Sequence, residues 1–380
     1  MNTFCSYFNA GVCRSCDLIE LNDQEHTHLK EQALRTALQK SYSGLIEKTI
    51  TGQRTGFRNK AKLVVTGSVD HPVIGLWGKD YPDQGRELLA CPLHHERLNQ
   101  LISSLPEFIR KSNLAPYSIA DKRGELKGII AFYSEGSGDM YLRFVLRSEE
   151  SVSRIKKYLS LLTQEFSDLK VVSVNIQPVP HAILEGEKEI LLTETKAIHH
   201  NLGHVDMSLG TKGFVQTNQS VALKLYQTAS DWVKELHPEK FAELFAGQGA
   251  FSFFCASGFR TGLGIEINPE AVEIANMTAK AQGLSQLTFQ CADAGKVRNT
   301  LLIFSPDLIL VNPPRRGLAG ALPLLLEADP QHIIYSSCDY KTLAEDLLRL
   351  TSRYVVSKVQ LFDMFPNTSH FETLVLLQRL

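Results

Sequence analysis

The chain has 380 residues, of which 43% are hydrophobic and 21% charged, so it is long enough for about two globular domains and is neither disordered nor collagen-like. No run of roughly 18 apolar residues occurs and the first residues form no apolar signal core, so we expect neither a membrane span nor Sec-type secretion. Basic and acidic residues nearly cancel, 40 against 41, which means that a nucleic-acid partner would have to be held by local basic patches.

The seven cysteines fall into two groups along the chain. An odd number without a secretory signal favours a reducing compartment, so we expect a cytoplasmic protein without a disulfide framework. Four lie in the first quarter of the chain and three in the last third: Cys5, Cys13, Cys16 and Cys91, then Cys255, Cys291 and Cys338. This division indicates separate roles for the two groups.

The first part of the chain predicts an α+β domain. The expected elements are an amphipathic helix at 23–42 and alternating strands at 61–69, 127–135, 140–148 and 169–179. Such alternation is typical of an antiparallel sheet, which two or three helices should accompany. A polar, histidine-containing stretch, Glu194–Asp206, is the predicted junction, which gives domains at 1–206 and 207–380.

In the second part strands and helices alternate, which implies parallel crossovers. The expected strands are 241–245, 261–268, 286–294, 306–314 and 332–338, and the expected helices lie within 246–258, 269–283, 321–328 and 341–353. The last two strands, 354–365 and 371–380, have no helix between them and should pair antiparallel. This mostly parallel, seven-stranded sheet resembles the class I (Rossmann-like) methyltransferase fold.

A candidate cofactor loop follows the strand at 241–245. Gly247 and Gly249 allow a tight turn and the close approach of a ligand to backbone N–H groups. Glu266 ends the next strand, where it can accept hydrogen bonds from ribose hydroxyls. The third glycine of a dinucleotide motif is missing and an Asn-Pro-Pro sequence comes later, which favours S-adenosylmethionine over NAD. Two more polar residues lie at the C-terminal ends of the third and fourth strands of this half: Asp293 and Asn312.

Two residues are candidates for the reaction itself. Cys338 ends a strand at the same edge of the sheet, which favours a nucleophile, whereas a buried structural thiol is the simpler interpretation for Cys255 and Cys291. Glu372 begins an otherwise apolar final strand, where a carboxylate is either an ordinary paired residue or a functional one.

Four motifs together resemble the RNA uracil-5-methyltransferase family: FVQTN at 214–218, NPPRRG at 312–317, SSC at 336–338 and HFET at 370–373. The likeness covers nearly the whole chain and is greatest to the shorter bacterial members that act on 23S rRNA and lack a TRAM domain. It implies S-adenosylmethionine as cofactor, Cys338 as nucleophile and Glu372 as base. It also implies a set of cofactor contacts: Gln216, Phe245, Glu266, Asn312 and Asp293. The chain departs from the family at Asp339, where Asn usually follows the cysteine.

The chemistry of this reaction agrees with that pair of residues. Carbon 5 of uracil is a poor nucleophile, but a thiolate that adds at carbon 6 converts the ring to an enolate that accepts a methyl group at carbon 5. A carboxylate must then remove the carbon-5 proton before the thiol can leave. The base also has to be flipped out of any stack to reach the pocket. The expected product is 5-methyluridine, and the resemblance implies uracil 747 of 23S rRNA as the target.

The early cysteines have the spacing C-x7-C-x2-C-x74-C, which suits zinc or an iron–sulfur cluster. Structural zinc sites usually contain two C-x-x-C pairs, and this chain has one. The matching positions of the family hold a [4Fe–4S] cluster, so the resemblance implies that cluster on Cys5, Cys13, Cys16 and Cys91. Four unrelated buried thiols are the alternative.

Basic residues interleaved with an aromatic residue, Phe57, suggest an RNA surface in the first domain, although each run taken singly is more often a solvated face. They are Arg54, Arg58, Lys60, Lys62, Lys122, Arg123, Lys127, Arg143 and Arg147. We expect no membrane contact and no obligate protein partner. The alternatives are the same reaction on a tRNA or another rRNA uracil, a non-catalytic RNA-binding or assembly protein, and an iron–sulfur oxidoreductase, for which no flavin or redox-partner motif occurs.

Overall fold

A computed structural model describes residues 3–78, 84–179 and 185–380. The chain divides into two compact units. The N-terminal unit contains the chain up to Cys16, Gln53–Asn201 and Leu209–Thr211, and the C-terminal unit contains Asp17–Gly52, Leu202–Ser208 and Lys212–Leu380. The predicted boundary after residue 206 placed Asp17–Gly52 in the first domain, but this segment packs with the second half of the chain.

The C-terminal unit is built on a sheet in which eight described strands have the order β1-β16-β17-β15-β14-β11-β12-β13. Their bounds are β1 Glu47–Ile50, β11 Lys240–Leu244, β12 Thr261–Glu266, β13 Leu287–Cys291, β14 Leu308–Val311, β15 His332–Ser337, β16 Tyr354–Phe362 and β17 Glu372–Arg379. Strand β17 runs antiparallel to both of its neighbours, and the other pairs are parallel. The six parallel strands and the antiparallel hairpin predicted from the sequence are confirmed.

The prediction of seven strands was wrong by one, because β1 joins the sheet beside β16. Its sequence, EKTI, is four residues long and half polar, too short to show an alternating pattern. Pairing with β16 satisfies backbone groups at what would otherwise be the open edge of the sheet.

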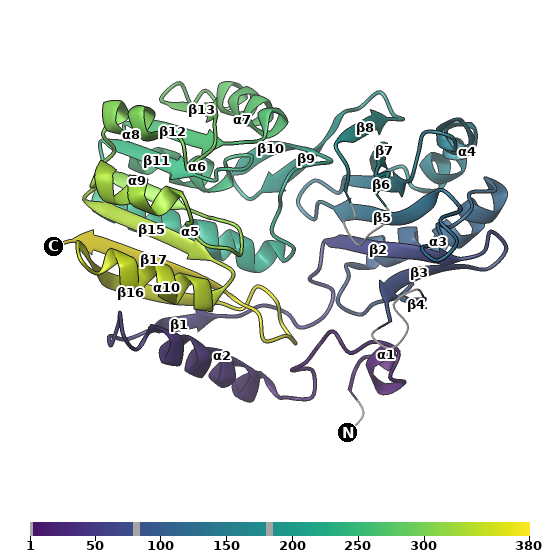
Figure 1. Ribbon diagram of the computed structural model, residues 1–380, viewed down its shortest axis with the longest axis horizontal. Coiled ribbons are helices and arrows are strands. Elements are labelled where there is room, and N and C mark those ends of the chain that lie inside the picture. Colours follow the sequence, from purple (N-terminus) through teal and green to yellow (C-terminus); the bar gives the residue numbers. More distant parts are fainter. Residues whose placement is uncertain (1–2, 79–83, 180–184) are drawn as a thin grey trace. The chain divides into compact units, whose positions relative to one another are not determined.

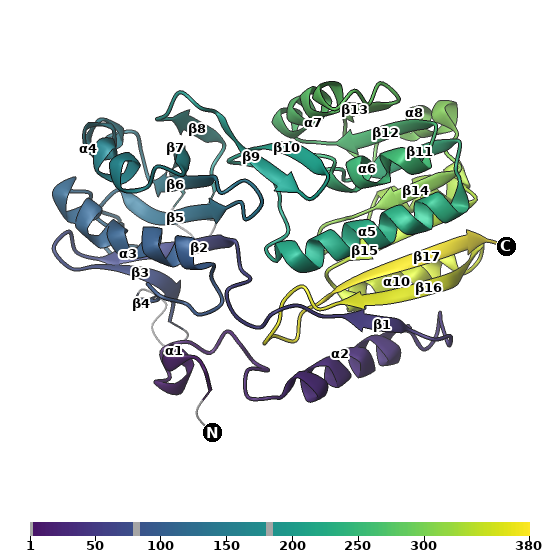
Figure 2. The same ribbon diagram turned by 180° about the vertical axis from the view of Figure 1, so that it is seen from behind.

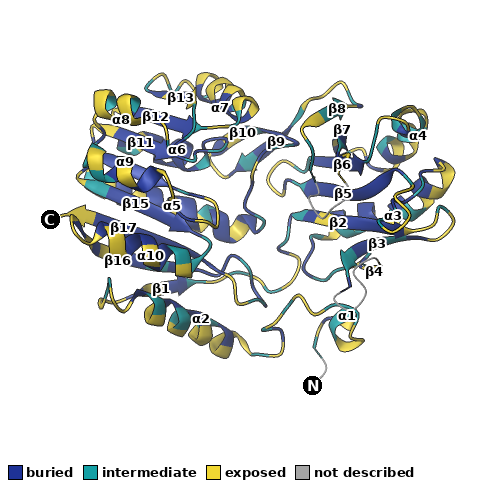
Figure 3. Ribbon diagram, viewed as in Figure 1, coloured by how far each residue is buried: buried dark blue, intermediate teal, exposed yellow. Residues whose placement is uncertain are grey.

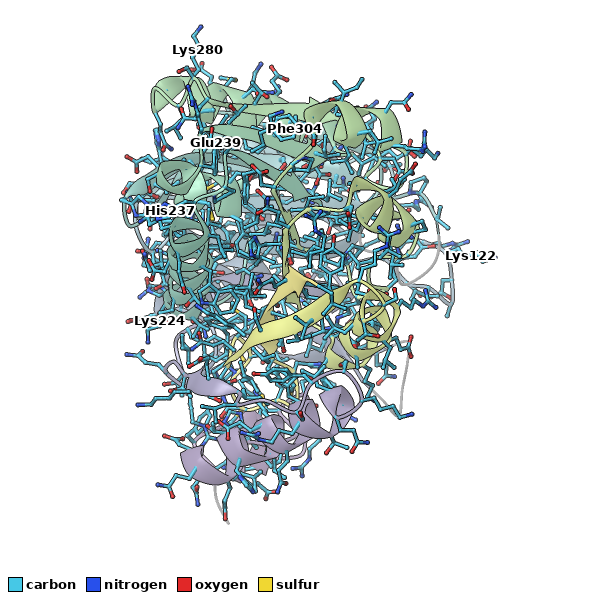
Figure 4. The ribbon with its side chains drawn as sticks, turned by 90° about the vertical axis from the view of Figure 1, so that its left-hand side faces the viewer. Lys122, Lys224, His237, Glu239, Lys280 and Phe304 are labelled. Atoms are coloured by element: carbon cyan, nitrogen blue, oxygen red, sulfur yellow. The ribbon has the colours of Figure 1, made fainter. Side chains whose placement is uncertain are left out.

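Helices cover both faces of this sheet (Figures 1 and 2). One side carries α5 Gln219–Leu236, α6 Ala250–Cys255, η1 Ala256–Gly258 and α7 Pro269–Ala281. The other carries α2 Asp23–Leu38, α8 Arg298–Phe304, α9 Ala321–Ala328 and α10 Tyr340–Leu350. Each layer of helices buries its own apolar cluster against the strands, which are the most buried elements (Figure 3). Charged side chains such as Lys224 on α5 and Lys280 on α7 point outward (Figure 4).

The N-terminal unit holds a second sheet, in which seven described strands have the order β4-β3-β2-β5-β6-β7-β8. Its elements are α1 Ser6–Asn9, β2 Lys60–Gly67, β3 Pro72–Trp77, β4 Gly85–Glu87, α3 Glu96–Lys111, β5 Leu126–Tyr133, β6 Met140–Leu146, α4 Val152–Glu165, β7 Leu169–Ile176 and β8 Lys188–Leu191. The sheet is antiparallel as predicted except for β6 and β7, which are parallel because α4 connects them as a crossover. Helices α3 and α4 share an apolar core with the strands.

Strands β9 Ala197–Leu202 and β10 Val205–Gly210 form a separate two-stranded sheet. Within the described residues, no helix is long and apolar enough to cross a membrane.

Candidate active site

The cofactor loop begins with an unusual backbone conformation. Phe245, directly after β11, has a φ of +61°, in the left-handed region that a bulky residue rarely adopts. Gly249 also has a positive φ, and a side chain there would meet the ring of Phe289, since an added Cβ would lie 2.4 Å from its Cζ. Strain of this kind occurs where the surrounding structure imposes a conformation for function, and here it shapes the turn before α6.

Two carboxylates fix this loop from opposite sides. Glu266 accepts hydrogen bonds from the backbone N–H groups of Gly247 and Asn268, both at 2.8 Å, so its orientation at the end of β12 is set by the loop itself. Glu243 lies buried beneath the loop, where its Oε2 accepts from the Ser252 N–H at 2.9 Å and from the Ser252 hydroxyl. Burial raises the pKa of Glu243 to about 8. Glu243 therefore holds the start of α6, while Glu266 is the carboxylate presented at the strand end.

The register of the sheet brings most of the predicted cofactor residues together. Leu244 pairs with both Ile265 and Val311, so the residues that follow them lie side by side at one edge. Those residues are Phe245, Glu266 and Asn312.

A pocket of about 300 Å³ opens at this edge, lined by Phe245, Asp293 and the segment 316–321 among others. The side chain of Asp293 is oriented by the N–H of Gly295, which donates to its Oδ1 at 2.9 Å. Gln216 comes from the segment before α5, is buried, and is not among the residues that line the pocket.

The predicted nucleophile and base lie on neighbouring strands. Strands β15 and β17 are antiparallel with Ser337 opposite Thr373, so Cys338 and Glu372 occupy the next positions at the same end. Glu372 is only 1% exposed, and its Oε1 accepts a hydrogen bond from the Ser336 hydroxyl at 2.8 Å. Burial raises the pKa of Glu372 to about 7, although the Ser336 hydrogen bond opposes that effect. A carboxylate in this state can both accept and release a proton near neutrality.

Arg315 is a third member of this group that the sequence did not assign to the reaction. Burial and the neighbouring Glu372 raise the pKa of the Cys338 thiol, while the charge and a hydrogen bond of Arg315 lower it. The available sequence signal was its position directly after the Asn-Pro-Pro motif.

The four early cysteines gather in the N-terminal unit as free thiols. Burial raises the pKa of Cys16 to about 12, and Cys91, Cys13 and Cys5 add to that effect, so the other three thiols lie within electrostatic range of Cys16. Nevertheless, the described residues contain no group of three or more Cys, His, Asp or Glu side chains arranged to hold a metal ion.

Arg58 belongs to this cysteine group rather than to an RNA surface. Its backbone N–H donates to the carbonyl of Leu93, two residues after Cys91, at 2.7 Å. Burial lowers the pKa of its guanidinium, and the nearby sulfur atoms of Cys91 and Cys16 partly offset that effect. Its half-buried guanidinium lies near these thiols and donates from Nε to the Lys60 carbonyl at 3.1 Å, which makes it a poor candidate for a phosphate contact.

The structure also contradicts Arg143 as a phosphate contact. Its side chain is 1% exposed and forms ion pairs with Glu189 and Glu185, both at 2.6 Å. Every residue of β6 is buried, so this strand presents no solvated basic face. By contrast, Lys122 and Arg123 are exposed, and Lys122 extends outward in Figure 4.

The strand order, the glycine-containing loop after β11 and the acidic end of β12 define an S-adenosylmethionine-dependent methyltransferase of class I. The same fold occurs in the solved structure of Pyrococcus abyssi tRNA (uracil-54, C5)-methyltransferase in complex with S-adenosyl-L-homocysteine, with a TM-score of 0.78 over 96% of this chain and 86% of that chain at 22% identity.

Within that class the family is also clear. The model of the tRNA (uracil-5-)-methyltransferase family matches residues 187–380. The 23S rRNA (uracil(747)-C(5))-methyltransferase RlmC of Shewanella baltica is 42% identical over 379 residues, 98% of this chain and 96% of its own. The RlmC of Vibrio cholerae is 42% identical over 376 residues, 99% of each chain. The chain therefore belongs to the RNA uracil-5-methyltransferase family, as its motifs predicted.

Proposed function

We propose that this protein methylates carbon 5 of a uridine in 23S rRNA to 5-methyluridine, with uracil 747 as the target. The observation that carries the proposal is the pairing of a half-buried thiol, Cys338, with a buried carboxylate, Glu372, at the cofactor edge of a methyltransferase sheet. The names of relatives that are about two-fifths identical over nearly the whole chain supply the RNA and the position.

In the first step Cys338 adds as a thiolate to carbon 6 of the flipped uracil, and the electron pair of the carbon 5–carbon 6 double bond moves toward the carbon-4 carbonyl oxygen. Arg315 favours the thiolate, because its guanidinium lowers the pKa that burial raises. Carbon 5 of the resulting enolate is nucleophilic. S-adenosylmethionine, when bound, supplies the electrophilic methyl group on its sulfonium.

In the second step Glu372 removes the proton from carbon 5. The electrons of that C–H bond re-form the double bond, and the bond between carbon 6 and sulfur breaks to return the Cys338 thiolate. Ser336 donates to Oε1 of Glu372, which orients the carboxylate and leaves Oε2 to accept the proton. With a pKa near 7, Glu372 is a stronger base than an ordinary carboxylate and is still largely ionised above neutral pH.

The residues at the strand ends fit S-adenosylmethionine. Glu266, held by two backbone N–H groups, would accept from ribose hydroxyls, with Phe245, Asp293 and Asn312 beside it. The buried Oε1 of Gln248 in the loop has no protein partner, which suits a site completed by a polar ligand. Gln216 is proposed as a further contact from the segment before α5.

We also propose that Cys5, Cys13, Cys16 and Cys91 hold a [4Fe–4S] cluster. Support comes from four free thiols within electrostatic range in one unit, next to the cation of Arg58. Because a cluster of several iron atoms holds its thiolates further apart than one ion does, the lack of a single-ion arrangement among the described residues does not conflict with it. Ligation would tie the start of the chain to Cys91 and so stabilise the fold. Anaerobic purification should give a brown protein with iron and sulfide, and their absence would refute this assignment.

The test of the function is methylation of transcribed RNA by the purified protein. A 23S rRNA fragment containing uracil 747 should gain 5-methyluridine at that position by mass spectrometry, and a tRNA transcript should not. Cys338→Ala should abolish methylation while leaving the fold intact. Methylation by Cys338→Ala would exclude the nucleophile, and methylation of tRNA alone would exclude the proposed target.

A further inference from the structure

Lys30 on α2 is a buried cation that fastens the segment leading to the proposed base. Its side chain is about 1% exposed. Its Nζ donates to the Asp363 carboxylate at 2.6 Å, to the His370 carbonyl at 2.8 Å and to the Phe365 carbonyl at 3.2 Å. These three acceptors span nearly the whole connection between β16 and β17. One ammonium group therefore cross-links both ends of a segment that contains no helix or strand.

The same part of the chain makes further bonds to this connection. The Leu18 N–H donates to the Asn367 carbonyl and the Asp17 carboxylate accepts from the Ser369 N–H, both at 3.0 Å. Figure 1 shows α2 alongside β1, β16 and α10 in the C-terminal unit. The segment assigned to the first domain from sequence thus supplies the support for the loop before Glu372.

The burial of this ion pair is costly, which indicates that it is kept for geometry. Lys30 and Asp363 are both almost fully buried, and His26 adds its Nδ1 at 3.5 Å from the second carboxylate oxygen. A buried ion pair commonly contributes no more stability than well-packed apolar residues of the same size. What an apolar pair cannot do is hold two backbone carbonyls at fixed positions. One of them, on His370, is two residues before Glu372.

We propose that Lys30 is a positioning residue for removal of the carbon-5 proton, an inference that rests on the proposed function of Glu372. Without the ammonium group, the buried Asp363 carboxylate loses the cation at 2.6 Å, and the carbonyls of Phe365 and His370 lose the donor that links them to α2. The connection must then shift, and the start of β17 shifts with it. Glu372 lies at that start, so it is displaced from carbon 5, while Cys338, directly after β15, keeps its place.

This displacement has a specific chemical signature. Cys338 still adds to carbon 6 and carbon 5 still takes the methyl group, but the carbon-5 proton leaves slowly, so the carbon 6–sulfur bond persists. The methylated covalent enzyme–RNA adduct should accumulate, and kcat should fall while kcat/KM changes little, because the slowed step follows thiolate addition and methyl transfer. A misplacement of about 1 Å reduces the rate of a positioned step by up to roughly 100-fold.

The experiment compares full-length variants on the 23S rRNA fragment, with the adduct measured on denaturing gels at steady state. Lys30→Met removes the charge at similar size, and Lys30→Arg retains it. Glu372→Gln is the reference for blocked deprotonation. Leu34→Ala is the matched control, because Leu34 is fully buried on the same helix but belongs to the apolar core.

Lys30→Met should accumulate adduct as Glu372→Gln does, Lys30→Arg should release it, and Leu34→Ala should behave as the unaltered protein does. If Glu372→Gln forms adduct while Lys30→Met turns over without it, Lys30 has no positioning role and the proposed function stands. If Glu372→Gln itself forms no adduct and still methylates, the role of Glu372 fails and this inference fails with it. Should Lys30→Met not fold, Asp363→Asn weakens the same clamp; it is expected to accumulate adduct, and normal turnover by it would overturn the proposal.

Discussion

Ser336 donates a hydrogen bond to the proposed base, Glu372, and its removal should move the pH dependence of one step. The hydroxyl donates to Oε1 of Glu372 and lowers a pKa that burial raises to about 7. In Ser336→Ala the carboxylate loses this stabilisation, so its pKa rises further. A hydrogen bond to a charged group contributes about 1.5–3 kcal/mol. At about 1.4 kcal/mol per pH unit, the midpoint should rise by about 1–2 pH units.

The step to follow is breakdown of the covalent RNA adduct, measured by rapid quenching on denaturing gels between pH 6 and 10. Cys338 is already bonded to carbon 6 at that stage, so its own ionisation does not contribute. Glu372 must be ionised to accept the proton, so the rate should rise with pH through its pKa. Near pH 7, Ser336→Ala should release the adduct about tenfold more slowly and should recover at higher pH.

Ser230→Ala is the matched control for this prediction. Ser230 is also buried, and its hydroxyl donates to the Phe254 carbonyl at 2.7 Å rather than to a titrating group. Its pH profile should be that of the unaltered protein. Superimposable profiles for Ser336→Ala and the unaltered protein would refute the argument that the carboxylate oriented by Ser336 is the base.

Three further predictions concern stability, cofactor binding and the thiol. The pKa of Glu372 is raised in the folded state from 4.5 to about 7, so ionisation of Glu372 costs about 3 kcal/mol of stability as the pH rises through that interval. Glu372→Gln should therefore unfold at a higher urea concentration than the unaltered protein at pH 8 and lose this advantage at pH 4. Equal unfolding curves at pH 8 would contradict a buried charge at this position. Gly249→Ala should abolish the thermal shift caused by S-adenosylhomocysteine, because its Cβ would meet an aromatic ring, whereas Gly247→Ala, with open space around the added atom, should retain more of it. Arg315→Gln should slow alkylation of Cys338 by iodoacetamide at a given pH, as judged by mass spectrometry of that peptide, since the guanidinium lowers the pKa of the thiol; an unchanged rate would mean that Arg315 does not stabilise the thiolate.

The strand-end residues could be predicted because a topological rule fixes where they meet. In a parallel sheet the carboxyl ends of all strands lie at one edge, so polar residues after successive strands are enough to predict a shared site. Glu266 and Asn312 follow this rule, and the register of the sheet places them at the same edge on either side of Phe245. The antiparallel last strand brings Glu372 to the same edge, which the missing helix before it indicated.

Long-range packing could not be predicted in the same way. The apolar periodicity at 23–42 predicts an amphipathic helix but does not indicate which sheet it covers. Contacts of the observed helix, Asp23–Leu38, with α10 and the pairing of β1 assign this segment to the C-terminal unit. The short helix α8 was missed because seven residues give barely two turns of periodicity.

The basic residues of the N-terminal unit show why the near-zero net charge is informative. Three of the cations that suggested an RNA surface, Lys62, Arg143 and Arg147, form ion pairs with acidic residues of the same unit: Glu185, Glu189 and Glu125. A cation that is already paired with a carboxylate neutralises little phosphate charge, so it displaces few of the counterions condensed on the RNA. The field available to RNA must therefore come from exposed cations such as Lys122 and Arg123 rather than from the count of basic residues in the sequence. In the proposed reaction, specificity would then depend more on the pocket that receives the flipped base, since surface charge sets affinity but does not distinguish one uridine from another.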